Sequence, residues 1–353
     1  MRFKKFTALA LAVVTAASVA MTGCGSRIDE DAVVATLGDK EISLGLANFM
    51  AQYTAVSYDS YITMGYAKEN MWSQDLSGNG KTMQDNVKDG ILTQIQTNYL
   101  LEDHMKDYGV EITDEELSDI DTAAQQFMDD NSKEAIRTMG AKKEYVAEML
   151  RLNLIQKKMH NAIIATVDTE VSDEEAAQRT FSYMKISLTT YTDESGKQQT
   201  YSADETTVVK KNADDAAQKA QSDFDGTAQE YSYDVKTYSY GSDEKSEADG
   251  GFCDAVIAAA NSMTAGQVSG LIEGADCYYI IRLDSEFDAD ATEKKKESII
   301  SDRQDQLYQD VTDGYKDAVK IKVDEDEWAK VKFDNIFTAP PAADNSDSSA
   351  TAE

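Results

Sequence analysis

The sequence has very few of the residues on which common catalytic sites depend. Of its 353 residues only two are histidines, and none follows residue 160; only two are prolines, Pro340 and Pro341, and three are cysteines. It contains no Gly-rich phosphate loop, no Gly-x-Ser-x-Gly and no Cys-x-x-Cys. The sequence therefore lacks the signatures of P-loop nucleotide hydrolysis, of serine hydrolases and of dithiol redox catalysis.

Basic residues are also scarce, with 34 Lys and Arg against 65 Asp and Glu, a formal net charge of −31. This excess of negative charge argues against nucleic acid as a partner and against direct adsorption to anionic lipids. Two interpretations remain open. The charge serves to keep the protein apart from anionic polymers in its surroundings, or it only solvates long helices.

The N-terminus has the pattern of a bacterial lipoprotein signal. Three basic residues among the first five precede an uncharged apolar stretch, residues 6–21, which is short for a membrane span. The segment Met21-Thr22-Gly23-Cys24 resembles a lipobox, with Met21 in the place of the usual Leu. We therefore predict a signal peptide at residues 1–23 and a lipid on Cys24 that holds the protein on the extracytoplasmic face of the cell membrane. The alternative is an ordinary secretory signal with a chance cysteine.

The first half of the mature chain is predicted to be mostly helical. Residues 32–42 have the pattern of a hairpin with a Gly-Asp turn, and Ser43 can cap the helix that follows. Helical periodicity returns over residues 84–108 and again around residues 145–159. Thr113 and Ser172 each begin a capping-box pattern, and the second opens a short helix to about Arg179.

The pattern changes at Phe181 to that of a small α+β unit. Alternation from Phe181 predicts a strand, and residues 277–283 predict a buried one. Helices are expected at 213–224 and 256–260, and a polar loop at 231–250. A long polar helix is expected at 291–320. The tail from Thr338 has the composition of a disordered segment.

Several short segments, in this order, resemble the PrsA/SurA group of extracytoplasmic foldases with an inserted parvulin-type (PpiC-like) peptidyl-prolyl isomerase domain. The hairpin resembles the opening segment of the family, and residues 110–117 resemble its recurring interhelical turn. Gly250-Gly251, Gly266-Gln-Val-Ser269 and Tyr278 to Leu283 match parvulin segments in order and spacing.

The resemblance implies an α+β fold class, with a discontinuous and mostly helical chaperone domain that carries an inserted parvulin-like domain. The expected segments are the signal peptide at 1–23, a helical domain at 24–180, the parvulin-like domain at 181–287, a returning helix at 288–337 and the tail at 338–353. The partners implied are unfolded exported polypeptides, and no cofactor is expected.

The chain departs from the parvulin pattern at the site itself. Lys185 and Tyr279 stand where the family carries histidines, and Asp243 matches a family Cys or Asp seven residues before the Gly-Gly pair. Phe252, Val256 and Met263 could form the apolar walls of a proline-binding cup. Because prolyl rotation needs such a cup and polar groups that favour the twisted amide, we expect weak or no isomerase activity. A competent isomerase that uses Tyr279 and Asp243, and a non-enzymatic envelope scaffold, are the alternatives.

Some residues keep two interpretations. His104 and His160 could take part in a metal site, but single helix histidines are more often surface or packing residues, and we predict no metal. Cys253 and Cys277 can pair in an exported chain, and nothing in the sequence places them at disulfide distance. The oligomeric state stays open. Met and aromatic residues between Met50 and Trp72 are either helix core or an adaptable client-binding cradle.

Overall fold

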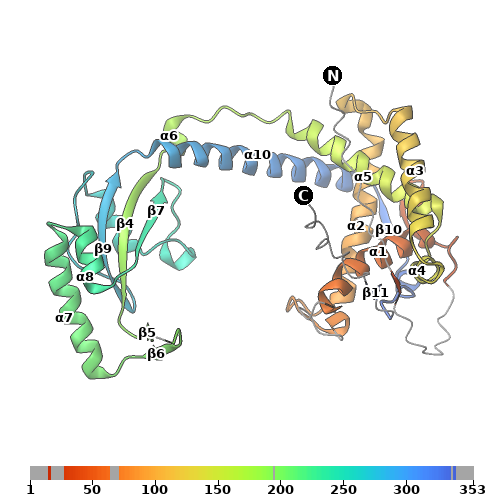
Figure 1. Ribbon diagram of the computed structural model, residues 1–353. Helices are drawn as coiled ribbons and strands as arrows, with labels where there is room; N and C mark the ends of the chain where they lie inside the picture. Colours follow the sequence, from red (N-terminus) through yellow and green to blue (C-terminus); the bar gives the residue numbers. More distant parts are fainter. Residues whose placement is uncertain (1–14, 17–27, 64–70, 194, 335–336, 339–353) are drawn as a thin grey trace, which may run out of the picture. The chain divides into compact units, whose positions relative to one another are not determined.

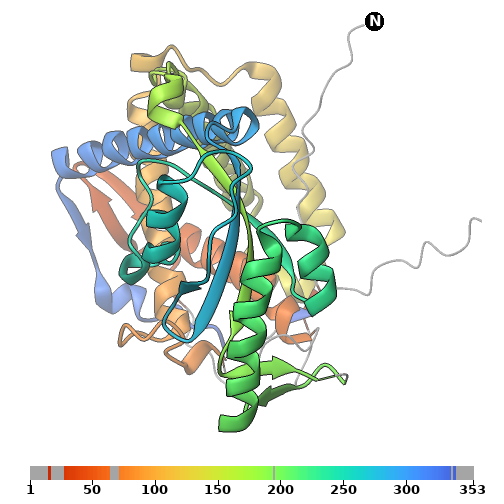
Figure 2. The same cartoon turned by 90° about the vertical axis from the view of Figure 1, so that its left-hand side faces the viewer.

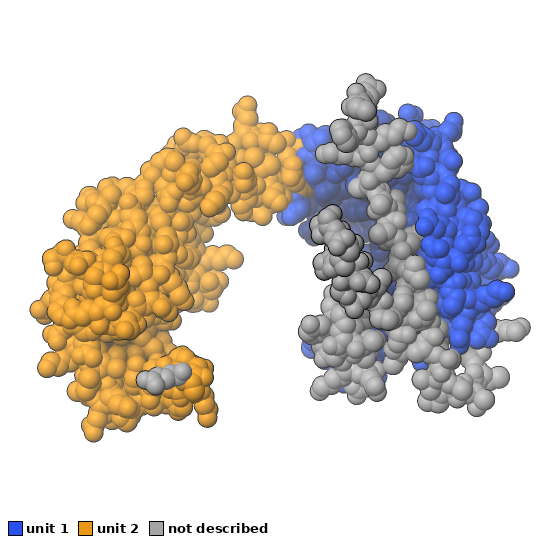
Figure 3. Space-filling model, in the orientation of Figure 1, with its two compact units in different colours: residues 1–166, 305–353 blue, residues 167–304 orange. Residues whose placement is uncertain are grey.

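A computed structural model describes residues 15–16, 28–63, 71–193, 195–334 and 337–338. Cys24, most of the predicted signal peptide and almost all of the predicted tail lie outside the described residues. The chain divides into two compact units (Figure 3): unit 1 comprises residues 1–166 and 305–353, and unit 2 comprises residues 167–304. The predicted architecture, a discontinuous helical domain that carries an inserted α+β domain, is confirmed. Unit 2 is longer at both ends than the predicted segment 181–287.

Unit 1 begins with the predicted hairpin, formed by β2 (Val33–Leu37) and β3 (Lys40–Ser43). Gly38 adopts a positive φ of 57° at the turn, where a residue with a side chain would be strained. The strand β10 (Ile321–Val323) pairs antiparallel with β2, so a segment from the end of the chain completes a three-stranded sheet with the order β10-β2-β3. This pairing joins the two parts of the discontinuous unit.

Most of the other described elements of unit 1 are helices (Figure 1). Their bounds are α1 Leu44–Thr63, α2 Met83–Asp103, α3 Asp114–Asp130, α4 Lys133–Met139, α5 Lys143–Ile164 and α11 Glu325–Trp328, with short 3₁₀ helices at Met71–Ser73 and Met105–Tyr108. The capping box of Thr113 and Glu116 is present, as predicted. The strands β1 (Thr15–Ala16) and β11 (Phe337–Thr338) pair antiparallel.

Some of the Met and aromatic residues between Met50 and Trp72 belong to the core of unit 1. Met50, Met71 and Trp72 are buried in that core, whereas Tyr53 and Tyr58 are partly buried against it. The first three therefore serve as packing residues. The side chains of residues 60–70 lie outside the described part of the structure.

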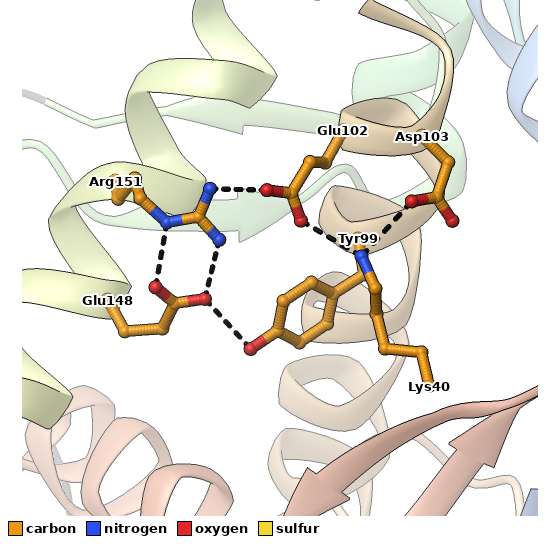
Figure 4. A network of polar contacts seen from close by, with 6 residues as sticks. All are labelled: Lys40, Tyr99, Glu102, Asp103, Glu148 and Arg151. Carbon is orange, nitrogen blue, oxygen red and sulfur yellow. Dashed lines mark hydrogen bonds and ion pairs between the residues drawn. The ribbon is translucent and has the colours of Figure 1, made fainter. Parts of the chain in front are cut away.

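A network of charged groups ties the hairpin to two helices of unit 1 (Figure 4). Arg151 on α5 donates to Glu102 on α2 at 2.5 Å and to Glu148 at 2.7 Å, and Lys40 on β3 donates to Glu102 at 2.9 Å. Tyr99 donates its hydroxyl to Glu148 at 2.9 Å. Since these groups are partly buried and bonded to several partners, the network contributes more than an isolated surface ion pair would.

Unit 2 is built on a four-stranded antiparallel sheet with the order β7-β4-β9-β8 (Figures 1 and 2). The strands are β4 (Arg179–Ser187), β7 (Val235–Tyr240), β8 (Ile272–Glu273) and β9 (Cys277–Ser285). A separate small hairpin is formed by β5 (Thr190–Thr192) and β6 (Gln198–Thr200). The helices are α6 Asp173–Ala176, α7 Ala203–Ala220, α8 Phe224–Tyr231 and α9 Asp254–Asn261, with a 3₁₀ turn at Glu247–Asp249.

The two faces of this sheet carry different cores. Met184, Ile186 and Ile280 pack against α7 and α8. The opposite face carries Phe181, Tyr279, Ile281 and Leu283 and packs against α9. The long helix α10 (Ala289–Ala318) begins in unit 2 and ends in unit 1.

Three sequence-based assignments in unit 2 were wrong. The segment 231–250, predicted to be a loop, contains β7, an edge strand whose side chains are mostly exposed and therefore show no apolar alternation. The helix predicted at 213–224 begins at Ala203, where a Ser202–Glu205 capping box starts it, and ends at Ala220. The short helix α6 ends at Ala176 rather than near Arg179, which already belongs to β4.

Candidate active site on the sheet of unit 2

Two of the predicted site residues face each other across the central strands of unit 2. Lys185 on β4 is directly opposite Tyr279 on β9 in the antiparallel register. The Nζ atom of Lys185 lies 5.7 Å from the centroid of the Tyr279 ring. Lys185 is exposed, whereas Tyr279 is buried with 7% of its surface accessible. The strand pairing thus brings together the two side chains that were predicted to stand in the place of the family histidines.

Phe252 lies at the centre of an aromatic cluster on the same sheet face. Its ring centroid is 4.5 Å from that of Tyr238, 5.0 Å from Tyr183, 5.4 Å from Phe181 and 5.6 Å from Tyr279. Tilted and edge-to-face pairs at these distances add to the free energy gained by burying the rings. Phe252 therefore occupies space on the sheet face that an open cup would offer to a ligand.

The Tyr279 hydroxyl lies in apolar surroundings next to thiols. Burial, and then the hydrogen bond to Cys277, raise the pKa of Tyr279 well above its usual value. Cys253 and Cys277 are buried in the same cluster and both are free thiols. Tyr279 therefore stays protonated at all physiological pH values and offers a neutral hydroxyl to its surroundings.

Asp243 has a different environment from the other two predicted catalytic residues. Its Oδ2 accepts from the Lys295 ammonium of α10 at 2.6 Å, and this hydrogen bond lowers the pKa of the carboxyl. Asp243 and Lys295 line a pocket of 240 Å³ together with Gln178 and the Gly250–Gly251 loop. Among the described contacts of Asp243, none reaches Lys185 or Tyr279, so the structure does not bring the three residues together.

The three residues predicted to form the apolar walls of the cup differ in their burial. Val256 on α9 is completely buried in the cluster, whereas Met263 is partly buried and its carbonyl accepts from Arg179 Nη2 at 2.8 Å. Val256 thus packs α9 on the sheet and offers no surface to a ligand. Phe252 and Met263 keep partial exposure.

Sequence reasoning missed Glu244, which positions the aromatic cluster. Its Oε1 accepts from the Tyr238 hydroxyl at 2.9 Å and from the backbone N–H of Phe252 at 3.0 Å. Burial and this carboxylate raise the pKa of Tyr238 to about 12. Tyr183 was also missed, although its spacing of two residues from Lys185 places both on one face of β4. No sequence signal marked Glu244, because it lies in a turn after a strand that was not predicted.

The chemistry open to this face is limited. A neutral tyrosine hydroxyl, a lysine ammonium and aromatic rings can bind an apolar segment and donate hydrogen bonds. Within the described residues, no group of three or more His, Cys, Asp or Glu is placed to hold a metal ion, and no helix has both the length and the apolar character needed to cross a membrane.

Comparison with known proteins gives a family match for the segment that contains the candidate site. Residues 171–295 match the family model of the PPIC-type PPIase domain. The match includes the whole four-stranded sheet and each predicted catalytic and substrate-binding residue, so the parvulin resemblance seen in the sequence is confirmed for this segment. No curated protein matches the chain.

Solved structures of foldases are similar to the chain at low identity. The foldase protein PrsA from Lactococcus lactis shares 16% identity, with 85% of this chain and 97% of that chain covered and a TM-score of 0.35. PrsA from Streptococcus pneumoniae shares 19%, with 72% and 97% covered and a TM-score of 0.28. PrsA from Bacillus subtilis shares 17%, with 70% and 90% covered and a TM-score of 0.24. At these identities and scores the similarities do not tell what this chain does.

Proposed function

We propose that this protein is a lipid-anchored extracytoplasmic foldase that binds unfolded exported polypeptides, and that its parvulin-type domain has weak or no prolyl isomerase activity. The family match over residues 171–295 supports the assignment to foldases and isomerases. The single observation that carries the proposal of weak activity is the direct pairing of Lys185 with Tyr279 on one sheet face, at the two positions that the sequence resemblance aligns with the family histidines.

The physical argument concerns the twisted amide. Prolyl isomerisation has a barrier of about 18–20 kcal/mol and breaks no covalent bond. The catalyst must offer an apolar cup and fixed polar groups that favour the twisted state. Here Lys185 adds a charge, Tyr279 has its hydroxyl close to Cys277, and Phe252 fills the centre of the face. Each change removes part of the arrangement that the reaction needs.

The test is a proline-limited refolding assay with the soluble Cys24→Ser chain. We expect catalytic amounts of the protein to leave the slow phase unchanged, or to speed it by a small factor only. Acceleration comparable with that by an active parvulin measured in parallel would refute the proposal of a weakened site. A competent isomerase is the second candidate function, and the family match together with the neutral Tyr279 hydroxyl favours it.

Client binding is tested separately. Unit 1 exposes Leu76 and Leu117, and its partly buried Tyr53 and Tyr58 lie at the edge of the core. Exposed apolar side chains can bind varied unfolded segments. We expect the protein to suppress aggregation of a reduced, unfolded client at near-equimolar amounts. If it suppresses the aggregation of none of several such clients, a non-enzymatic envelope scaffold becomes the better assignment.

A further inference from the structure

Lys88 is a lysine buried in unit 1, far in sequence from the candidate active site. It lies on α2 with 4% of its surface accessible, and its Nζ donates to the carbonyl oxygen of Trp328 at 2.8 Å. The same atom lies 5.0 Å from the centroid of the Trp328 ring. Among the ion pairs between described residues, none involves Lys88.

This environment leaves the ammonium partly unsatisfied. An ammonium has three N–H donors, and the carbonyl of Trp328 accepts one of them. A buried charge without an opposite charge in direct contact is costly, and burial and the nearby Lys332 lower the pKa of Lys88 more than Asp85, Asp89 and Glu325 raise it. Two donors of a buried cation therefore have no acceptor in the described part of unit 1.

The buried lysine lines a pocket of 240 Å³, here called the Lys88 pocket. Its walls are formed by residues of α2 and of the segment around α11: Lys81, Asp85, Lys88, Asp89, Glu325, Trp328, Ala329 and Lys332. The indole ring of Trp328 and the methyl group of Ala329 provide an apolar side. Lys88 and the exposed Lys332 provide a positive one.

The acidic residues of the lining are partly compensated. Asp89 forms an ion pair with Lys81 at 2.6 Å, and Asp85 accepts from the Thr82 hydroxyl at 2.7 Å near the start of α2. The three lysines and three carboxylates of the lining balance, so it is neutral overall. Among the ion pairs between described residues, however, none involves Lys88 or Lys332, so these two ammonium groups remain open to an anion. A monoanion meets less repulsion from Asp85 and Glu325 than a dianionic phosphate, for which the lining has no guanidinium.

We propose that the Lys88 pocket binds a carboxylate, supplied either by a small organic acid or by the C-terminus of a polypeptide. The carboxylate oxygens accept the two free donors of Lys88, with Lys332 as a second cation, and the aliphatic part of the ligand packs on the Trp328 ring. The site is independent of the sheet face in unit 2.

The two tryptophans of the chain allow a direct test by NMR, because Trp328 lies in the pocket and Trp72 lies in the core with its indole bonded to Asp59. The probes are acetyl-leucine and acetyl-leucine amide, which differ in the charge of one group. We expect acetyl-leucine to shift the indole signal of Trp328 and not that of Trp72, and the amide to bind at least about tenfold more weakly. Equal binding of acid and amide, or tighter binding of inorganic phosphate, would overturn the proposal.

Three lysine variants test whether acetyl-leucine binding depends on the Lys88 pocket or is unspecific. Lys88→Met should weaken acetyl-leucine binding at least about tenfold, and Met can fill the apolar space so that the fold is retained. Lys332→Met, an exposed position, should weaken it by a smaller factor, and Lys106→Met, an exposed lysine outside the pocket, should leave it unchanged. Unchanged binding in folded Lys88→Met refutes the site.

The source of the carboxylate is distinguished by ligand length. A tripeptide with a free C-terminus that binds more tightly than acetate assigns the pocket to polypeptide ends. Equal affinity of acetate and tripeptide assigns it to small organic acids. Both results support carboxylate binding, and absence of binding by every carboxylate probe overturns it.

Discussion

Lys185 and Tyr279 are a directly opposed pair on neighbouring antiparallel strands, with the lysine Nζ 5.7 Å from the centroid of the tyrosine ring. A cation over an aromatic ring is a stabilising contact, although a weak one where the lysine is exposed. The pair joins the two positions that the sequence resemblance aligns with the family histidines. Their contributions to activity are therefore best tested together.

The double substitution Lys185→His with Tyr279→His should restore isomerase activity. It removes the ammonium and places two imidazoles, which can be neutral near pH 7, at the matching positions. We expect kcat/KM for prolyl isomerisation to rise at least about tenfold over that of the parent chain. The measurement is a proline-limited refolding assay, with each single variant as a control. A folded double variant with no gain would show that other features of the site limit activity.

Removing Phe252 should destabilise unit 2. Its ring contacts four other aromatic rings, so Phe252→Ala should lower the free energy of unfolding of unit 2 by about 2 kcal/mol. Phe287→Ala is the matched control, because Phe287 is 49% exposed and should change little. The hydrogen-exchange rates of the β4 and β9 amides measure the loss of stability caused by each substitution. Equal effects of the two substitutions would contradict the central role of Phe252.

The charged network of Figure 4 predicts a pH-dependent contribution to the stability of unit 1. Burial alone would raise the pKa of Glu102, but hydrogen bonds from Arg151 and Lys40 outweigh it and lower the pKa below the value of 4.5 for a free Glu. The contribution of Glu102 is therefore fully present above pH 4.5 and is lost as the pH falls through the folded-state pKa.

Glu102→Gln should accordingly lower the free energy of unfolding of unit 1 by about 1–2 kcal/mol at pH 7, and the difference from the parent chain should shrink below pH 4.5. Urea unfolding followed by tryptophan fluorescence reports on this unit, because both Trp72 and Trp328 belong to it. Asp121→Asn, at the exposed ion pair with Lys143 in the same unit, is the control and should have little effect at either pH. A loss that does not depend on pH would argue against an ionic origin.

The two cysteines of unit 2 should behave as buried thiols. Cys253 and Cys277 are free and have 5% and 3% of their surface accessible. In the Cys24→Ser chain we expect almost no reaction with a thiol reagent under native conditions, and two reactive thiols after unfolding without reductant. If no thiol appears after unfolding, the two residues form the disulfide that an oxidising compartment permits.

The lipid on Cys24 should provide the whole membrane attachment. Removal of residues 1–23 takes away three basic residues and no acidic ones, which takes the formal charge from −31 to −34. Such a body is repelled by an anionic leaflet, while two or more acyl chains hold it firmly. Cys24→Ala should release intact protein into the medium, as measured by fractionation of cells. Persistent membrane association of this variant would disprove the lipid anchor.

Several elements were predictable because their causes are local. The β2–β3 hairpin depends on a Gly-Asp turn, and α3 depends on the capping box of Thr113 and Glu116, so both patterns are visible in a few adjacent residues. The strand β9 is an apolar run and was also predicted correctly. In contrast, β7 is an edge strand with mostly exposed side chains, and its pairing with β4 is not encoded in its own polarity.

The sequence by itself determined the helical character of residues 43–166, the α+β insert with its parvulin resemblance, and the absence of histidine beyond residue 160. Only the tertiary structure decided which candidate site residues meet. Strand register places Lys185 opposite Tyr279, while the ion pair with Lys295 holds Asp243 elsewhere and Val256 is buried under α9. It also placed Lys88 beside Trp328, 240 residues later. The reason is physical: capping and periodicity act between near neighbours, whereas burial and ion pairing depend on contacts that form only when distant segments pack.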